Sequence, residues 1–329
     1  MKTKFRVVLA VAGGLLLAGG LLCLVAMAGV GFRLEDLSNA GPWEERRFTQ
    51  PAGDVSELVL HAANFQVSVT PWDGDTVDIR YWENWETKFD ASYEGGRMTL
   101  AQKPYGRRVW RISLDARIPD IEVRIPREHV LACELLTTND SVKIAQLAFT
   151  QLSVTSSNGS LVMQDVAAKE GDILLKTTND TITLKNLSAG GRIEGVTTNG
   201  TVDAENLRCQ DLELRSTNDS LRLRDAVCPG SAQLHTTNGE LRLEGVDIPR
   251  ITATTTNDGV TLSGLEFQSA SFMTTNSDII GSLPGPEADY TVTASTTNGR
   301  VHAGSPRANG GKTLALQTTN GDIDISFGQ

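Results

Sequence analysis

The residues best suited to chemistry are scattered along this chain. The four histidines, His61, His129, His235 and His302, include no pair at the spacing of a metal site or a catalytic triad. Neither a Gly-rich phosphate loop nor a Cys-x-x-Cys pair occurs. The sequence therefore predicts no catalytic centre and no cofactor, and we expect the protein not to be an enzyme.

Two of the four cysteines are placed to react with each other. Cys209 and Cys228 each lie ten residues after an asparagine of a repeat, Asn199 and Asn218, so we expect them in adjacent coils. A separation of ~4.8 Å between coils is within reach of a disulfide, although parallel side chains would strain that bond. A disulfide and an apolar thiol pair are both compatible with this pattern.

The repeat that relates these cysteines is built on asparagine. An asparagine preceded by two Ser or Thr residues recurs ten times at spacings of 19 to 22 residues. Periodicity in this range indicates a solenoid, and stacked amides can bond from coil to coil as a structural asparagine ladder. Asparagine also tolerates left-handed backbone angles, which suits a turn. The ten residues are Asn139, Asn158, Asn179, Asn199, Asn218, Asn238, Asn257, Asn276, Asn298 and Asn320.

Aliphatic residues keep fixed distances from each asparagine. Leu152, Ile173 and Leu212 lie six residues before one, and Leu161 and Ile182 lie three residues after one. Polar residues alternate with these rows, which is the period of a β-strand. Ordering a coil of about 20 residues costs on the order of 20–40 kcal/mol, more than the roughly 9–18 kcal/mol that about six buried aliphatic side chains return. Coils must therefore stack. The predicted fold is all-β, a single-stranded parallel β-solenoid (β-helix) of about ten coils over residues 131–329.

Polar residues on either side of the asparagines also form rows. The threonine two positions before the asparagine is expected to face inward in a stack of hydroxyls, as at Thr137, Thr177, Thr197, Thr236 and Thr255. Aspartate and glycine follow the asparagine in alternate coils, which separates the like charges. A calcium-binding edge is the functional alternative, but a line of carboxylates does not converge on one point. The aspartates are Asp140, Asp180, Asp219 and Asp258.

The strand at Ile121–Pro126, the segment Leu135–Asn139 and the serial Thr-Thr-Asn-Gly repeats resemble a bacterial putative-adhesin family of β-solenoid domains of unknown function. The resemblance covers roughly residues 55–329. It implies a single-stranded β-solenoid, usually on an exported or membrane-anchored protein, and it supplies no catalytic residues.

Residues 1–32 have the composition of a targeting segment. The run from Val7 to Phe32 holds no charged side chain and follows three basic residues. It exceeds the roughly 20 residues of a transmembrane helix, and the basic residues should stay cytoplasmic. We expect residues 7–32 to be an uncleaved anchor in the cell membrane, with the C-terminal domain extracytoplasmic. The alternative is a signal peptide cleaved after Ala28, which would make the protein secreted.

Two regions precede the repeats. Residues 33–54 read as a polar linker, and residues 55–130 as an N-terminal β cap that holds most of the tryptophans. Hairpin signals occur at Trp72–Asp75 and Glu94–Arg97. Large aromatic residues in this region either pack the cap or stack on sugars. These are Tyr81, Trp82, Trp85 and Trp110.

The net charge and the even repeat spacing limit the classes of function that we expect. The formal net charge is −10, which disfavours nucleic-acid binding. We expect a non-enzymatic surface scaffold or binding module that presents a flat sheet face to a glycan or a protein. The first alternative is an envelope scaffold that forms homo-oligomers through an open C-terminal coil ending in the strand Asp322–Phe327. The second is a carbohydrate-active β-helix enzyme, which the even spacing disfavours because it leaves no room for long cleft-forming loops.

Overall fold

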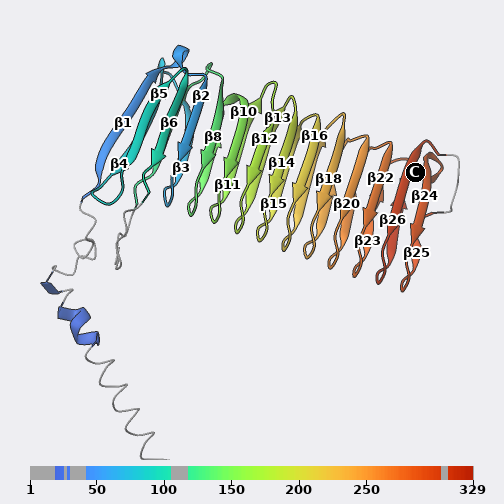
Figure 1. Cartoon of the computed structure of the whole chain (residues 1–329). Coiled ribbons are helices and arrows are strands. Elements are labelled where there is room, and N and C mark those ends of the chain that lie inside the picture. Colours follow the sequence, from blue (N-terminus) through green and yellow to red (C-terminus); the bar gives the residue numbers. More distant parts are fainter. Residues whose placement is uncertain (1–18, 26–27, 30–41, 105–117, 305–309, 329) are drawn as a thin grey trace, which may run out of the picture.

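The computed structural model describes residues 19–25, 28–29, 42–104, 118–304 and 310–328. The chain is an all-β parallel β-solenoid, as the sequence predicts, with about nine turns rather than the predicted ten or so, and its coils form a straight stack (Figure 1). Residues 19–25 are helical. Within the described ranges, no helix is both long enough and apolar enough to cross a membrane. Most of the predicted anchor lies outside those ranges.

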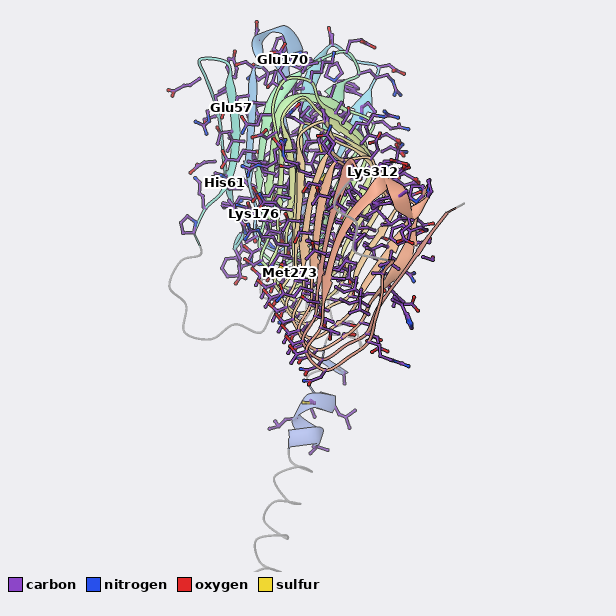
Figure 2. The ribbon with its side chains drawn as sticks, turned by 90° about the vertical axis from the view of Figure 1, so that its right-hand side faces the viewer. Glu57, His61, Glu170, Lys176, Met273 and Lys312 are labelled. Carbon is purple, nitrogen blue, oxygen red and sulfur yellow. The ribbon has the colours of Figure 1, made fainter. Side chains whose placement is uncertain are left out.

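Each coil contributes one strand to each of two series of paired strands, here called the first and the second sheet, which converge toward one edge of the molecule (Figure 2). The two are joined where Ala148 and Phe149 pair with Ala167 and Ala168. The first sheet carries the strands that precede the asparagine turns. In spatial order its strands are β5 (Phe89–Glu94), β6 (Arg97–Gln102), β2 (Glu57–His61), β8 (Leu131–Leu136), β10 (Ala148–Thr155), β12 (Ile173–Lys176), β14 (Arg192–Val196), β16 (Asp211–Arg215), β18 (Ser231–His235), β20 (Arg250–Thr254), β22 (Ser269–Met273), β26 (Lys312–Gln317) and β24 (Tyr290–Ser295).

The second sheet carries the strands that follow the turns. In spatial order its strands are β1 (Glu44–Pro51), β4 (Thr76–Glu83), β7 (Ile121–Pro126), β3 (Val67–Trp72), β9 (Val142–Ala145), β11 (Leu161–Ala168), β13 (Ile182–Ala189), β15 (Val202–Arg208), β17 (Leu221–Val227), β19 (Leu241–Glu244), β21 (Val260–Ser263), β23 (Ile279–Leu283), β27 (Ile323–Phe327) and β25 (Val301–His302). Two short 3₁₀ helices, η2 (Ala52–Asp54) and η3 (Glu287–Asp289), lie between strands.

The core is the space between the two sheets. The aliphatic rows six residues before and three residues after the asparagines are buried, for example Leu152, Ile173, Leu161 and Ile182, except at Val301 in the outermost coil. In-register parallel pairing places each of these side chains over its counterpart in the next coil, as Leu152 over Ile173. The period of two in the sequence therefore identifies the inward faces correctly.

At the C-terminal end the coils do not follow sequence order. β26 lies between β22 and β24, and β27 lies between β23 and β25. Residues 312–327 thus form the penultimate coil, and residues 290–302 form the outermost one. The prediction that Asp322–Phe327 forms the open edge is wrong for this reason. The last two asparagine spacings are 22 residues each, and the extra length lets the chain step over one coil.

The N-terminal end shows the same interchange. β2 lies between β6 and β8, and β3 lies between β7 and β9, so the outer coil is formed by β6 and β7, which come later in the chain. β5 pairs antiparallel with β6, and β4 pairs antiparallel with β7. β5 therefore covers this end of the first sheet, and β4 followed by β1 covers this end of the second sheet; β4 and β5 run against the solenoid strands.

Two predictions for the N-terminal region need correction. The predicted linker 33–54 contains β1, which pairs with β4 over its full length of eight residues. The predicted hairpin at Trp72–Asp75 is absent, because β7 enters between β3 and β4. The hairpin at Glu94–Arg97 does join β5 to β6, and Gly95 and Gly96 adopt the positive φ angles that such a turn requires.

Candidate functional site

The ten asparagines of the repeat form one chain of side-chain hydrogen bonds, here called the asparagine spine. Each Nδ2 donates to the Oδ1 of the neighbouring coil at 2.5–2.9 Å where the partner is another of the ten. Asn139 continues the spine by donating to Asn64. At the other end the spatial order is Asn276, Asn320, Asn298, in agreement with the interchanged coils.

A left-handed backbone conformation does not explain why asparagine occurs at these ten positions, contrary to the interpretation from the sequence. Among the described non-glycine residues, positive φ occurs at Asn64 but at none of the ten spine residues. It occurs instead seven residues after a spine asparagine, in a second row that the sequence analysis missed. This row is Gln146, Asp165, Asn186, Asn206, Asp225, Gly245 and Gly264.

The second row carries its own short ladder. Asn186 Nδ2 donates to Asp165 Oδ1 at 2.7 Å, and Asn206 Nδ2 donates to Asn186 Oδ1 at 2.9 Å. The recurrence of Asn, Asp and Gly at one offset is the usual signature of left-handed backbone. That signal was available in the sequence and could have identified the second turn of each coil.

The threonine row faces inward as predicted, but its hydroxyls do not bond to one another. Thr177 Oγ1 donates to the carbonyl of Gly159 at 3.0 Å, and Thr236 Oγ1 donates to that of Asp219 at 2.9 Å. The same bond from coil to coil recurs along the row. Buried hydroxyls and buried carbonyls satisfy each other in this way, so this edge is a structural element.

The alternation of aspartate and glycine after the spine has a steric cause. A Cβ on Gly159 would overlap the carbonyl of Asp140, and a Cβ on Gly200 would overlap that of Asp180. The aspartates bind the backbone beside them: Asp180 Oδ1 accepts from Thr181 N at 2.7 Å. Across the described ranges, no three His, Cys, Asp or Glu side chains lie close enough to share a metal ion.

The first sheet has two different outer faces. Over β12, β14 and β16 the outward side chains form an ion-pair network. Glu194 contacts Lys176 at 3.0 Å, and Glu213 contacts Arg192 at 3.1 Å and Arg215 at 2.6 Å. Glu194 is largely buried by its partners. This face is internally neutralised and offers few free charges to a ligand.

Farther along the same sheet the outward side chains are small and mostly uncharged. Over β20, β22, β26 and β24 they form what we call the hydroxyl face. Lys176 belongs to the ion-pair network and Met273 to the hydroxyl face, and both are labelled in Figure 2. Register places Thr252 beside Ser271, and Ala315 between Ser271 and Thr293. The face comprises Thr252, Thr254, Ser269, Ser271, Met273, Thr313, Ala315, Gln317, Thr291, Thr293 and Ser295.

The predicted aromatic group does not act as one surface. Tyr81 is buried, with its ring 5.3 Å from that of Phe89, so it packs the interior. Trp82 lies on the opposite side of β4, under the guanidinium of Arg80 at 5.3 Å. Trp85 is exposed, and Trp110 lies outside the described residues.

The histidines are widely separated and bind local groups. His129 Nε2 lies 2.7 Å from the carbonyl of Val55, and His235 Nδ1 lies 2.7 Å from Thr254 Oγ1. Neither contact pairs a histidine with a nucleophile and a carboxylate, the arrangement that acyl transfer requires. The described histidines therefore give no geometric support to an active site.

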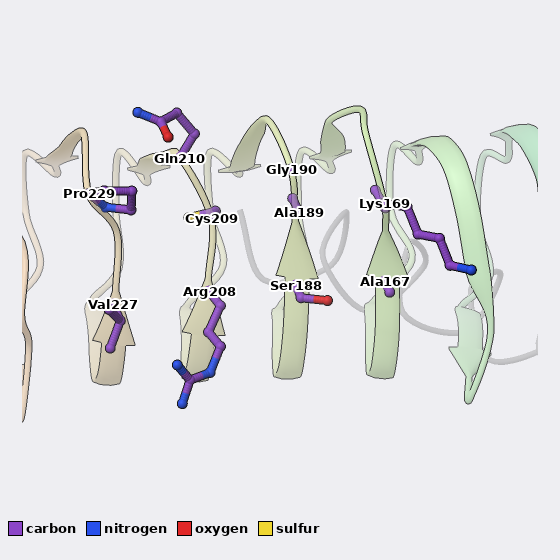
Figure 3. Close-up of a pocket in the computed structure, with 11 residues that line it drawn as sticks. Ala167, Lys169, Ser188, Ala189, Gly190, Arg208, Cys209, Gln210, Val227 and Pro229 are labelled. Carbon is purple, nitrogen blue, oxygen red and sulfur yellow. The ribbon is translucent and has the colours of Figure 1, made fainter.

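A shallow pocket of about 430 Å³ opens where β11, β13, β15 and β17 end (Figure 3). Its walls come from successive coils and include Ala168, Ala189, Gly190 and Cys209. Cys228 lies beside Cys209 in the next coil, with 2.9 Å between the two Sγ atoms, and both are free thiols. The two predicted partners are therefore neighbours in space.

The chain is similar to known proteins over most of its length. A family model described as Toastrack DUF4097 matches residues 55–326. A solved putative adhesin from Parabacteroides merdae is 11% identical, covers 89% of this chain and 98% of its own, and has a TM-score of 0.34. A putative adhesin from Bacteroides fragilis is 13% identical, covers 86% and 97%, and has a TM-score of 0.30. No curated protein matches the chain.

Proposed function

The chain belongs to the Toastrack DUF4097 family through residues 55–326, and from this premise we propose that it is a non-enzymatic, membrane-anchored surface module. Residues 7–32 would hold it in the membrane and place the solenoid outside the cell. The proposal names adhesion or scaffolding, with a glycan or a protein bound on a sheet face, as the role of the solenoid.

One observation carries the proposal: the first sheet contains a flat hydroxyl face beside an ion-paired face. The side chains of the hydroxyl face stand at rung spacing, and the charged residues of its four strands are Arg250 and Lys312, each the first residue of its strand. Hydroxyl groups both donate and accept hydrogen bonds, which suits the polyhydroxylated surface of a glycan. The ion-paired face has its donors and acceptors already engaged, so we assign binding to the hydroxyl face.

Binding of the full chain to a glycan array tests this assignment, with a matched pair of variants. Ser271→Arg places a long cation in the hydroxyl face, and Ser153→Arg makes the same change at the equivalent position of β10. We expect Ser271→Arg to abolish binding and Ser153→Arg to preserve it. Equal loss in both variants, or no glycan retained, would overturn the assignment. Release of soluble sugar from a bound glycan would favour the enzymatic alternative.

The open end of the solenoid supports a second function, self-association. Within the described residues β24 pairs only with β26, and β25 pairs only with β27. Val301 in β25 is 42% exposed. Because antiparallel strands cover the other end, two molecules would have to pair tail to tail across a two-fold axis. Sedimentation of the full chain over a wide concentration range should then show a dimer, whereas a monomer throughout would eliminate this function.

A further inference from the structure

Cys209 and Cys228 are brought together by the parallel register of the solenoid. They follow β15 and β17, which are in register from Val202 paired with Leu221 to Arg208 paired with Val227. Cys209 N donates to the carbonyl of Val227 at 3.4 Å, which keeps the two coils in contact at this point. Adjacent coils hold Cα atoms about 4.8 Å apart, inside the range that disulfides span. The separation of the two backbones therefore allows the sulfurs to be joined.

The two cysteines differ in access. Cys209 lines the pocket and is 5% exposed, whereas Cys228, beside it in the next coil, is completely buried. The pocket exists because the preceding coils place small side chains, Ala168 and Ala189, where a larger residue would fill the space. A small disulfide-containing reagent entering the pocket would meet the sulfur of Cys209 first.

The pair also shares a proton. The two Sγ atoms are within hydrogen-bonding distance, and either can be the donor. This contact lowers the pKa of Cys228 and raises the pKa of Cys209. Because either sulfur can hold the shared proton, the negative charge can also lie on Cys209, the member of the pair that lines the pocket. A thiolate on Cys209 is the form that attacks a disulfide.

We propose that Cys209 and Cys228 form a reversible intercoil disulfide, made by thiol–disulfide exchange with an exogenous disulfide that enters the pocket. In the first step the Cys209 thiolate attacks one sulfur of that disulfide, whose S–S bond breaks and releases one thiolate. The released thiolate then removes the proton of Cys228. The Cys228 thiolate attacks Cys209 Sγ, the mixed disulfide breaks, and the second half leaves as a thiolate that takes up a proton from solvent. Two cysteines are oxidised and one exogenous disulfide is reduced to two thiols.

The third buried thiol supplies the internal control. Cys133 lies between Leu58 and Leu152 in its row and has no cysteine beside it. Burial raises the pKa of Cys133, with a smaller effect of Glu134 in the same direction. It should remain a thiol under conditions that oxidise the pair.

The experiment uses the full chain with Cys23→Ser, so that the exposed cysteine cannot react. The protein is incubated with oxidised glutathione, unfolded, alkylated and digested, and the peptides are identified by mass spectrometry. We expect the peptides of Cys209 and Cys228 to be cross-linked within one chain, and Cys133 to be alkylated. The oxidised protein should also melt at a higher temperature than the same protein treated with dithiothreitol, and Cys228→Ser should remove that difference.

Three outcomes would overturn the proposal. The first is full alkylation of both cysteines after incubation with oxidised glutathione. The second is a reaction that stops with glutathione attached to Cys209. The third is a cross-link between two chains. The melting comparison between the oxidised protein and the dithiothreitol-treated protein uses the unmutated pair of Cys209 and Cys228. It therefore remains a valid test even if Cys228→Ser folds poorly.

Discussion

The middle of the solenoid and its two ends are built from the same repeat but assembled differently. From β8 to β23 each coil lies on the coil that precedes it in the chain. At both ends a later coil is interchanged with an earlier one. The rows of residues within a coil therefore determine the structure of that coil. Its position in the stack depends on the lengths of the segments that join it to the other coils.

This difference between the middle and the ends should appear in the free energy of unfolding of core mutants. A coil inside the stack has a neighbour on both sides, whereas the outermost coil has only one. If residues 312–327 lie inside the stack, their core residues should behave like those of the middle, although they come last among the described strands.

The largest effect should come from truncating core leucines. Leu214 lies between Gly195 and Leu234, and Leu316 lies between Phe272 and Ala294. Both are buried. We expect Leu214→Ala and Leu316→Ala each to lower the free energy of unfolding by about 2–5 kcal/mol, because both leave a cavity flanked on two sides. Denaturant titration followed by circular dichroism measures both.

The comparison between the two leucines is the informative part. A much smaller loss for Leu316→Ala than for Leu214→Ala would mean that residues 312–327 form the outer coil after all. Val292, in the outermost coil, is already 7% exposed and supplies the reference for a position with one neighbour.

Most of the fold follows from rows of residues that the sequence displays. The aliphatic rows and the inward threonines identify both inner faces. The interchange at the ends is not visible in the same way, because every coil offers nearly the same rows to its neighbours. Only the spacings of 22 residues before Asn298 and Asn320 indicate that the chain does something different there.

The asparagine spine should give a smaller and graded effect. Asn218 donates to Asn199 and accepts from Asn238, at 2.6 and 2.8 Å, whereas Asn298 makes a single spine bond, to Asn320. At about 0.5–1.5 kcal/mol per bond, Asn218→Ala should cost about 1–3 kcal/mol and Asn298→Ala about half as much. Thermal unfolding of both variants tests this ratio, and equal losses would contradict a bonded chain of amides.

Only part of the candidate sites could be predicted from the sequence. The adjacency of Cys209 and Cys228 follows from counting residues from Asn199 and Asn218. The pocket beside them does not, because it arises from small residues, Ala168 and Ala189, at equivalent positions of the two preceding coils. The hydroxyl face was also missed, since it includes β24, whose neighbours depend on the interchange.

The smallest effect should be a pH dependence confined to the end. The backbone N–H and the guanidinium of Arg300 bind Asp322 and lower the pKa of its carboxyl group. A lowered pKa means that this clamp contributes stability above the ordinary carboxyl pKa, and that the contribution disappears as the pH falls through the lowered value. Because the groups are exposed, we expect local loosening of residues 290–302 rather than unfolding.

Hydrogen exchange, corrected for the intrinsic rate at each pH, measures that loosening. Protection of residues 290–302 should decrease on acidification in the native protein. In Asp322→Asn it should be lower at neutral pH and should change little with pH. If the native protein and the variant respond alike, another group causes the effect.

The interchanged C-terminal coils also constrain the order in which the molecule can be assembled. Residues 312–327 are synthesised after residues 290–302, yet they lie beneath them. The earlier segment must wait, or detach again, until the later one has added to β22 and β23. Growth by one rung at a time is therefore impossible at this end, and a nascent chain stopped between the two segments would expose β22 and β23 as a template for a foreign strand.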